Sequence, residues 1–165
     1  MSKGRRATMP YRLVYEGHVQ PEWIDWNGHM NDACYAIVFS RALDGLVDSI
    51  GLDAAGRARH DQTIFTLETQ TRFLKEMKLG QRFCVAGRVI AHDGKRLHAW
   101  LSMLEGDTCA ATSEQLILCV RIEANGARAV PFAPSVLEAL TAITEEDALT
   151  PMPDGLGRGI AIRRR

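Results

Sequence analysis

Hydrophobic residues recur at helical spacing through one long stretch of the chain. Between Asn31 and Gly51 they stand three and four positions apart, at Tyr35, Val38, Phe39, Ala42, Leu43, Leu46, Val47 and Ile50. This spacing is typical of a helix that packs one face into a core, and Ile37 widens the hydrophobic stripe. Asn31 or Asp32 can cap the start, and Gly51 can end the helix in the left-handed conformation. The pattern predicts a long and largely buried helix.

The pattern changes to alternation on both sides of this stretch. Alternating segments cover residues 11–20, 63–75, 83–89, 97–103 and 116–122, with residues 52–62 as an irregular connection. Asp93-Gly94 is a strong signal for a tight hairpin, and Gly80 and Gly106 mark further turns. Strands joined by short turns pair antiparallel. The sequence therefore predicts an α+β fold with one antiparallel sheet and one long helix against it.

Strict alternation along residues 63–75 predicts that Phe65, Leu67 and Phe73 share one face of their strand. Glu68 then lies on the opposite face.

Three segments are expected along the chain. Residues 1–9 read as a flexible N-terminus, and residues 10–123 read as the folded domain. Residues 124–165 read as an extension that holds a short helix over residues 134–143. Its last part is rich in proline and glycine and ends in three arginines, which indicates a flexible basic tail or a cover for a neighbouring subunit.

Composition narrows the class of protein. The 165 residues include 20 basic and 20 acidic side chains, so no polyanion-binding surface is expected and nucleic acid is not a predicted partner. Near-zero net charge favours association into a homodimer or homotetramer. The four cysteines form no C-x-x-C pair and read as buried thiols of a cytoplasmic protein. No membrane span, signal peptide or metal-ligand spacing is recognised.

The densest polar stretch, Pro21 to Asn31, lies immediately before the predicted helix. The first N–H groups of a helix are unpaired and carry partial positive charge, so they can bind a polarised carbonyl oxygen. Asp25, just upstream, can supply a base or a nucleophile. Asn27 and Asn31 can orient Asp25 or a water molecule. A loop that only caps the helix is the alternative interpretation.

The run Asp25-Trp26-Asn27-Gly28-His29-Met30-Asn31, followed by Tyr35, resembles the motif of the 4-hydroxybenzoyl-CoA-thioesterase-like family. The resemblance implies a hotdog fold, in which a curved antiparallel sheet wraps around one long helix. It makes Asp25 the catalytic carboxylate and the backbone N–H of Asp32 the group that polarises the thioester carbonyl. His29 braces the loop in that family. The chain departs from the motif in two places: Trp23 replaces a common acidic residue, and Asp32 replaces a frequent asparagine.

The similarity extends to one branch of this family. The runs 21–33, 40–42, 50–58 and 95–98 resemble the betainyl-CoA thioesterases, hotdog enzymes of carnitine degradation. This implies hydrolysis of betainyl-CoA to glycine betaine and CoA, with no cofactor and no metal. A trimethylammonium group cannot donate a hydrogen bond, so aromatic faces and a carboxylate should bind it. The substrate-binding candidates are Trp23, Trp26, Tyr35 and Glu68.

Three alternatives remain open at this stage. The same chemistry could act on another small acyl-CoA. Asp25-Trp26-Asn27 followed by His29 is also reminiscent of a hotdog hydratase motif, although the proline of that motif is missing and the histidine stands one residue too near. The third alternative is a non-catalytic acyl-CoA sensor, against which an intact Asp25 argues. The sequence does not separate general-base catalysis from nucleophilic attack by Asp25.

Overall fold

A computed structural model describes residues 11–160, and the predictions for residues 1–9 and for the three terminal arginines lie outside this range. The elements are β1 (Arg12–His18), a short 3-10 helix (Pro21–Trp23), α1 (Asp32–Asp48), α2 (Ala54–His60), β2 (Thr63–Phe73), β3 (Arg82–His92), β4 (Arg96–Glu105), β5 (Thr108–Glu123), β6 (Gly126–Ala129) and α3 (Pro134–Asp147).

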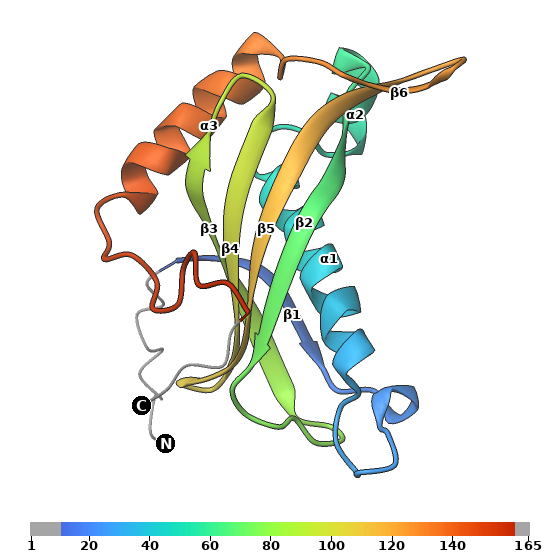
Figure 1. The fold of residues 1–165 in the computed structure, drawn as a ribbon, viewed down its shortest axis with the longest axis vertical. Coiled ribbons are helices and arrows are strands. Elements are labelled where there is room, and N and C mark those ends of the chain that lie inside the picture. Colours follow the sequence, from blue (N-terminus) through green and yellow to red (C-terminus); the bar gives the residue numbers. More distant parts are fainter. Residues whose placement is uncertain (1–10, 161–165) are drawn as a thin grey trace, which may run out of the picture.

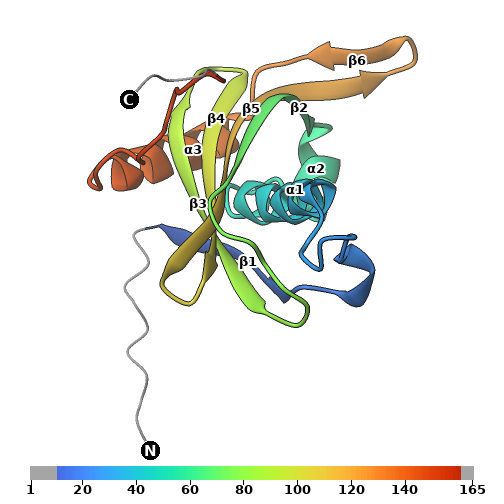
Figure 2. The ribbon, with the colours of Figure 1, turned by 60° about the horizontal axis from the view of Figure 1, so that its bottom comes forward.

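The strands form one antiparallel sheet in the order β1-β3-β4-β5-β2, and β6 pairs with the end of β5. The sheet is strongly curved, with α1 lying in its hollow and α3 on the other side (Figures 1 and 2). We call the side toward α1 the inner face and the side toward α3 the outer face. The predicted α+β architecture is confirmed.

The core lies between α1 and the inner face of the sheet. Helix α1 buries the predicted stripe, and alternate residues of the central strands, among them Val85, Leu101 and Ile117, meet it. Gly45 lets β1 approach the helix, because a Cβ atom there would lie 2.2 Å from the carbonyl oxygen of Val14. The helix is thereby fixed on the sheet, and its N-terminal end is fixed with it.

Two segments differ from the expected pattern. Residues 54–60 form α2 rather than an irregular connection, because Asp53 caps it by accepting a hydrogen bond from the Gly56 N–H at 2.8 Å. Strand β2 contains a bulge between Thr66 and Glu68, which breaks strict alternation. Glu68 and Phe65 pair with Leu116 and Leu118 of β5 and therefore share the outer face. The prediction that they lie on opposite faces was wrong.

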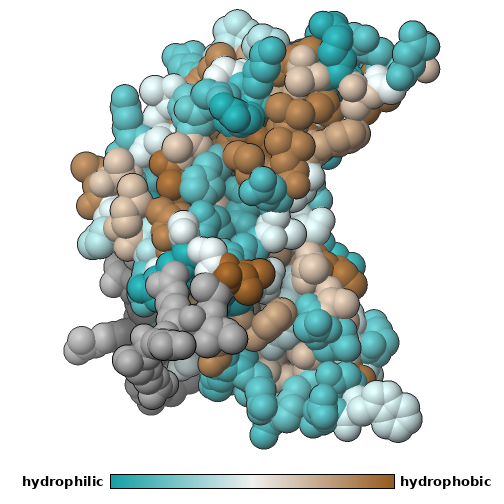
Figure 3. All heavy atoms as spheres, viewed as in Figure 1, coloured by the Kyte–Doolittle hydropathy of each residue, from teal (hydrophilic) through white to brown (hydrophobic). Residues whose placement is uncertain are grey.

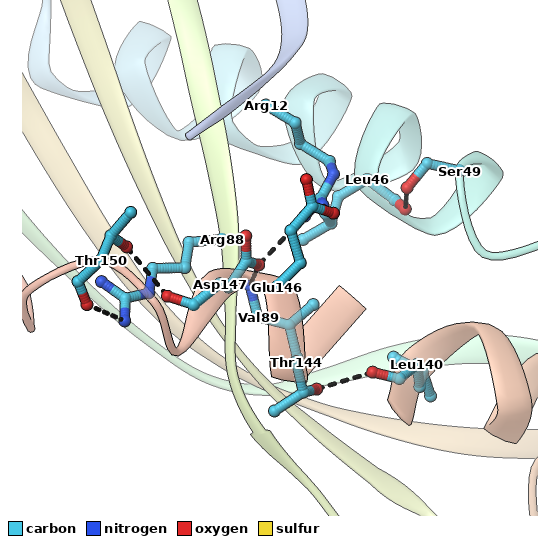
Figure 4. A network of polar contacts seen from close by, with 10 residues as sticks. All are labelled: Arg12, Leu46, Ser49, Arg88, Val89, Leu140, Thr144, Glu146, Asp147 and Thr150. Carbon is cyan, nitrogen blue, oxygen red and sulfur yellow. Dashed lines mark hydrogen bonds and ion pairs between the residues drawn. The ribbon is translucent and has the colours of Figure 1, made fainter. Parts of the chain in front are cut away.

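The C-terminal segment follows the outer face of its own chain over residues 134–158, and the flexibility expected for the basic tail stays a prediction. Helix α3 continues to Asp147, four residues beyond the predicted end. The buried guanidinium of Arg88 donates to the carbonyl oxygen of Thr150 at 3.0 Å (Figure 4) and to that of Pro151 at 2.6 Å. Arg72 donates to the carbonyl oxygen of Gly155 at 2.7 Å. Arginine side chains thus hold residues 150–158 against the sheet.

All four cysteines lie within residues 11–160, and none of them forms a disulfide. In the same range, no helix combines the length and the hydrophobicity needed to cross a bilayer.

Candidate active site

The polar stretch before α1 folds into a tight turn. Ile24 and Met30 pair as an isolated β-bridge, and within it the Asp25 N–H donates to the carbonyl oxygen of His29 at 2.9 Å. The Gly28 N–H donates to the carbonyl oxygen of Asp25 at 3.0 Å, and Gly28 has a φ of +76°. Glycine takes this left-handed conformation without steric cost. The turn fixes the backbone of Asp25 and His29 together.

The carboxylate of Asp25 is held by this same turn. Its Oδ1 atom accepts a hydrogen bond from the backbone N–H of Asn27 at 2.8 Å. Within residues 11–160, the second oxygen of Asp25 accepts no hydrogen bond. One oxygen is therefore positioned by the backbone, while the other remains available to water or to an electrophilic carbon.

The start of α1 carries the second chemical feature. Asn31 caps the helix, since its Oδ1 accepts from the Ala33 N–H at 3.0 Å, and the Asp32 carboxylate accepts from the same N–H at 2.9 Å. The backbone N–H of Asp32 itself makes no hydrogen bond to any described residue. An unengaged N–H at a helix N-terminus is a donor suited to a polarised carbonyl oxygen.

Asp25 and Asp32 line the same cavity, which has a volume of about 320 Å³. Its other lining residues are His29, Met30, Tyr35, Phe73, Leu74, Lys75 and Glu76. Three carboxylates face one ammonium, and that ammonium, on Lys75, is already paired with Glu105. The lining therefore carries excess negative charge. Within residues 11–160, no group of three or more His, Cys, Asp or Glu side chains could hold a metal ion.

Tyr35 and Phe73 form the aromatic part of the cavity. Their rings meet edge to face, with centroids 5.1 Å apart and planes at 76°. Tyr35 is buried and Phe73 is 54% exposed, so Phe73 presents the accessible ring. Burial raises the pKa of Tyr35, a hydrogen bond with the backbone of Met77 lowers it, and the nearby charge of Glu76 raises it, with a net upward shift. Its hydroxyl is therefore neutral at physiological pH.

His29 and Glu76 connect the turn to the loop after β2. The Nε2 atom of His29 lies 3.0 Å from the Oε2 atom of Glu76, and the Met30 N–H donates to the carbonyl oxygen of Met77 at 2.7 Å. These contacts fix the loop over residues 74–79 against the turn that carries Asp25.

The structure brings together five of the nine predicted site residues around this cavity or the helix start: Asp25, His29, Asn31, Asp32 and Tyr35. Asn27 contributes through its backbone N–H, and its side chain is exposed. Trp23 is buried and stacks on Phe83 at 6.5 Å, so it belongs to the core. The side chain of Trp26 is fully exposed and does not line the cavity.

The structure also separates Glu68 from Asp25. Glu68 lines a different cavity of about 480 Å³ on the outer face, together with His98 and Glu114. The bulge at β2 explains this placement, because it moves Glu68 to the face away from α1.

Five lining residues were not predicted as part of the site: Met30, Phe73, Leu74, Lys75 and Glu76. Phe73 was predicted to share a face with Phe65, but the same bulge places it on the opposite, inner face. Glu76 stands in the loop between β2 and β3, where no periodicity marks it. One feature could have pointed to Glu76. Strand β2 ends beside the start of α1, so charged residues just after β2 are candidates for the site.

Comparison with known proteins identifies the family. The family model of the thioesterase-like superfamily matches residues 19–140. This chain belongs to the thioesterase-like superfamily. Its hotdog architecture, a curved antiparallel sheet around one long helix, is thereby confirmed together with the expected family. The match includes the turn with Asp25, the whole of α1 and the cavity between them.

Individual members of the superfamily are similar over nearly the whole chain. Betainyl-CoA thioesterase of Pseudomonas aeruginosa is 43% identical over 90% of this chain and 94% of its own length. The L-carnitine dehydrogenase/betainyl-CoA thioesterase of Agrobacterium fabrum is 39% identical over 94% of this chain, which spans 31% of that longer protein. The resemblance to betainyl-CoA thioesterases is confirmed.

Solved structures of the superfamily have the same fold. A Staphylococcus aureus protein determined in complex with CoA is 32% identical, with a TM-score of 0.81 over 95% of this chain and 99% of that chain. A thioesterase-like protein of Pseudomonas putida is 34% identical, with a TM-score of 0.79 over 94% of this chain and 99% of that chain.

Proposed function

We propose that this protein hydrolyses betainyl-CoA to glycine betaine and CoA. One observation carries the chemistry: the half-buried carboxylate of Asp25 and the unengaged N–H of Asp32 line one cavity at the start of α1. A nucleophile or base beside an oxyanion donor is the pair that acyl transfer requires. The names of the two relatives support the substrate.

The reaction would proceed from these two groups. The carbonyl oxygen of the thioester accepts a hydrogen bond from the Asp32 N–H, and the N-terminal end of α1 stabilises the negative charge that develops there. In the general-base route, the second oxygen of Asp25 removes a proton from a water molecule whose oxygen attacks the carbonyl carbon. In the nucleophilic route, Asp25 attacks directly and water hydrolyses the anhydride. In both routes the carbon–sulfur bond breaks and CoA leaves as a thiolate that takes up a proton.

The remaining residues of the motif position these groups. The backbone of Asn27 orients the carboxylate, Asn31 caps the helix, and His29 holds the turn through Glu76. Acid–base and nucleophilic chemistry of this kind needs no cofactor besides the CoA that is part of the substrate. A cytoplasmic location is our proposal as well, because the four cysteines remain thiols.

Thiol release from a panel of acyl-CoAs tests the function. The panel contains betainyl-CoA, acetyl-CoA, 4-hydroxybenzoyl-CoA and crotonyl-CoA, and the measurement is kcat/KM for each substrate. We expect the highest value for betainyl-CoA. Hydration of crotonyl-CoA without thiol release would instead indicate a hydratase, and CoA binding without turnover of any substrate would indicate a sensor.

A homodimer formed through β2 is the assembly that we propose. Strand β2 is an 11-residue edge of the sheet. Hydrophobic side chains gather over its upper half and the neighbouring part of β5 (Figure 3), where Phe65 and Leu67 are about half exposed. Unpaired edges of this length favour pairing with another chain, most often around a two-fold axis. The cavity lies at the end of this edge, so a second copy would help to close it.

Leu67→Asp is expected to weaken the dimer, because it places a charge in the paired edge. Light scattering should give a dimer or a larger assembly for the wild type and a larger monomer fraction for the variant at the same concentration. Leu149→Asp is a matched control, since Leu149 is 86% exposed beyond the end of α3. A fully active wild-type monomer at assay concentration would contradict the proposed assembly.

A further inference from the structure

The cavity beside Asp25 has a charge that does not suit an ordinary acyl-CoA. The carboxylates of Asp25, Asp32 and Glu76 line it, and the one lysine in the lining is neutralised by Glu105. CoA is itself polyanionic, so this lining repels the nucleotide end of the substrate. An acyl group that carries a positive charge would be attracted to the same lining.

Glu76 lines this cavity with a carboxylate that no step of the reaction uses. Its Oε2 atom is 3.0 Å from Nε2 of His29, and within residues 11–160 its Oε1 atom makes no hydrogen bond. The contact with His29 orients the Glu76 carboxylate through one oxygen and leaves the other oxygen available to a ligand. The loop contact between Met30 and Met77 holds both residues in place.

Phe73 supplies the second element of a cation site. Its ring is 54% exposed at the cavity, while the buried Tyr35 packs against it edge to face. Tyr35 therefore supports the accessible ring from one side. A quaternary ammonium group has no N–H to donate and is attracted to a ring face and to a nearby carboxylate.

We propose that Phe73 and Glu76 form the subsite for the trimethylammonium group of the acyl moiety, with Tyr35 and His29 as their positioning residues. This assignment rests on the proposed function, because it names what binds the acyl group next to Asp25. It replaces Trp23, Trp26 and Glu68 as the sequence-based candidates for that role. Trp23 lies in the core, and Glu68 lies on the outer face.

The experiment compares two substrates of nearly the same shape. In 3,3-dimethylbutanoyl-CoA a carbon atom replaces the quaternary nitrogen of betainyl-CoA, so the two acyl groups differ mainly in charge. The readout is the selectivity, defined as kcat/KM for betainyl-CoA divided by kcat/KM for the uncharged isostere. A variant that only disturbs the fold or the catalytic carboxylate lowers both values and leaves this ratio unchanged.

Glu76→Gln and Phe73→Leu should each lower the selectivity about 5-fold, and the double variant about 25-fold, as expected for a cation contact with a partly exposed site. Glu138→Gln makes the same change of charge on an exposed residue of α3 and should leave the ratio unchanged. Glu68→Gln tests the earlier candidate directly, and we expect no change of the ratio there.

The outcomes separate this assignment from the proposed function. Absence of thiol release from both substrates would overturn the function and the subsite together. A wild type that hydrolyses both substrates equally well would overturn the subsite and leave a thioesterase of another specificity. A preference for betainyl-CoA that survives in Glu76→Gln and Phe73→Leu, or that is lost in Glu68→Gln, would overturn the assignment alone.

Discussion

Asp25→Asn is expected to lower kcat for thioester hydrolysis at least ~100-fold, the typical contribution of a general base or a nucleophile. The amide retains the shape of the carboxylate, and its oxygen can still accept the hydrogen bond from the Asn27 N–H. The turn should therefore survive, and only the charge and basicity are lost. Thiol release under saturating betainyl-CoA measures kcat, and thermal unfolding followed by circular dichroism measures the stability.

Asp48→Asn is the matched control for this substitution. Asp48 is an exposed residue at the opposite end of α1, so the same chemical change there leaves the cavity untouched. Wild-type kcat is expected for this control. If Asp25→Asn turned over substrate at close to the wild-type rate, Asp25 would not be the catalytic carboxylate. If it unfolded at a much lower temperature, the loss of activity would not report on catalysis.

The helix and the sheet could be predicted from sequence because their hydrophobic periods are regular. The stripe from Tyr35 to Val47 has no interruption, and its cap, Asn31, is the residue type that helix starts prefer. The turn that carries Asp25 could also be predicted, because it directly precedes the capping residue Asn31. Local sequence alone determines both features.

The faces of β2 could not be predicted, because a bulge adds one residue without any mark in the pattern. Simple alternation places Phe65 and Phe73 on one face and Glu68 on the other. With the bulge, Phe65 and Glu68 share the outer face, and Phe73 faces the helix. The substrate-binding residues follow from this register. A sequence-based list therefore included Glu68 and omitted Phe73.

Glu76 and Trp23 illustrate a second limit, which is tertiary contact. Glu76 becomes part of the site only because the loop after β2 hydrogen bonds to the turn at Met30. Trp23 is two residues from Asp25 in sequence, yet its ring turns into the core against Phe83. The closeness of Trp23 to Asp25 in sequence suggested a role in cation binding, but the fold places its ring in the core. The distance of Glu76 from Asp25 in sequence concealed a carboxylate that the fold brings into the site.

Asp147 ties α3 to strands β1 and β3. Its Oδ2 atom accepts from the backbone N–H of Val89 at 2.7 Å and from Nη1 of Arg12 at 3.0 Å (Figure 4). Val89 stands at an irregularity in the pairing of β3 with β4. A carboxylate at the C-terminal end of a helix is disfavoured by the helix dipole, so these two donors must stabilise it.

Asp147→Ala is expected to reduce the free energy of unfolding by about 3 kcal/mol, because it leaves a buried N–H unsatisfied and removes the more buried of the two carboxylates that pair with Arg12. For a chain of this size that corresponds to a fall in Tm of roughly 9 °C. Glu146→Ala is the control: the Glu146 side chain pairs with the same arginine but is 73% exposed. An exposed pair contributes at most about 1 kcal/mol, so Tm should fall by no more than about 3 °C. Differential scanning calorimetry measures both variants. Equal, small shifts for the two would show that Asp147 does not anchor the C-terminal helix.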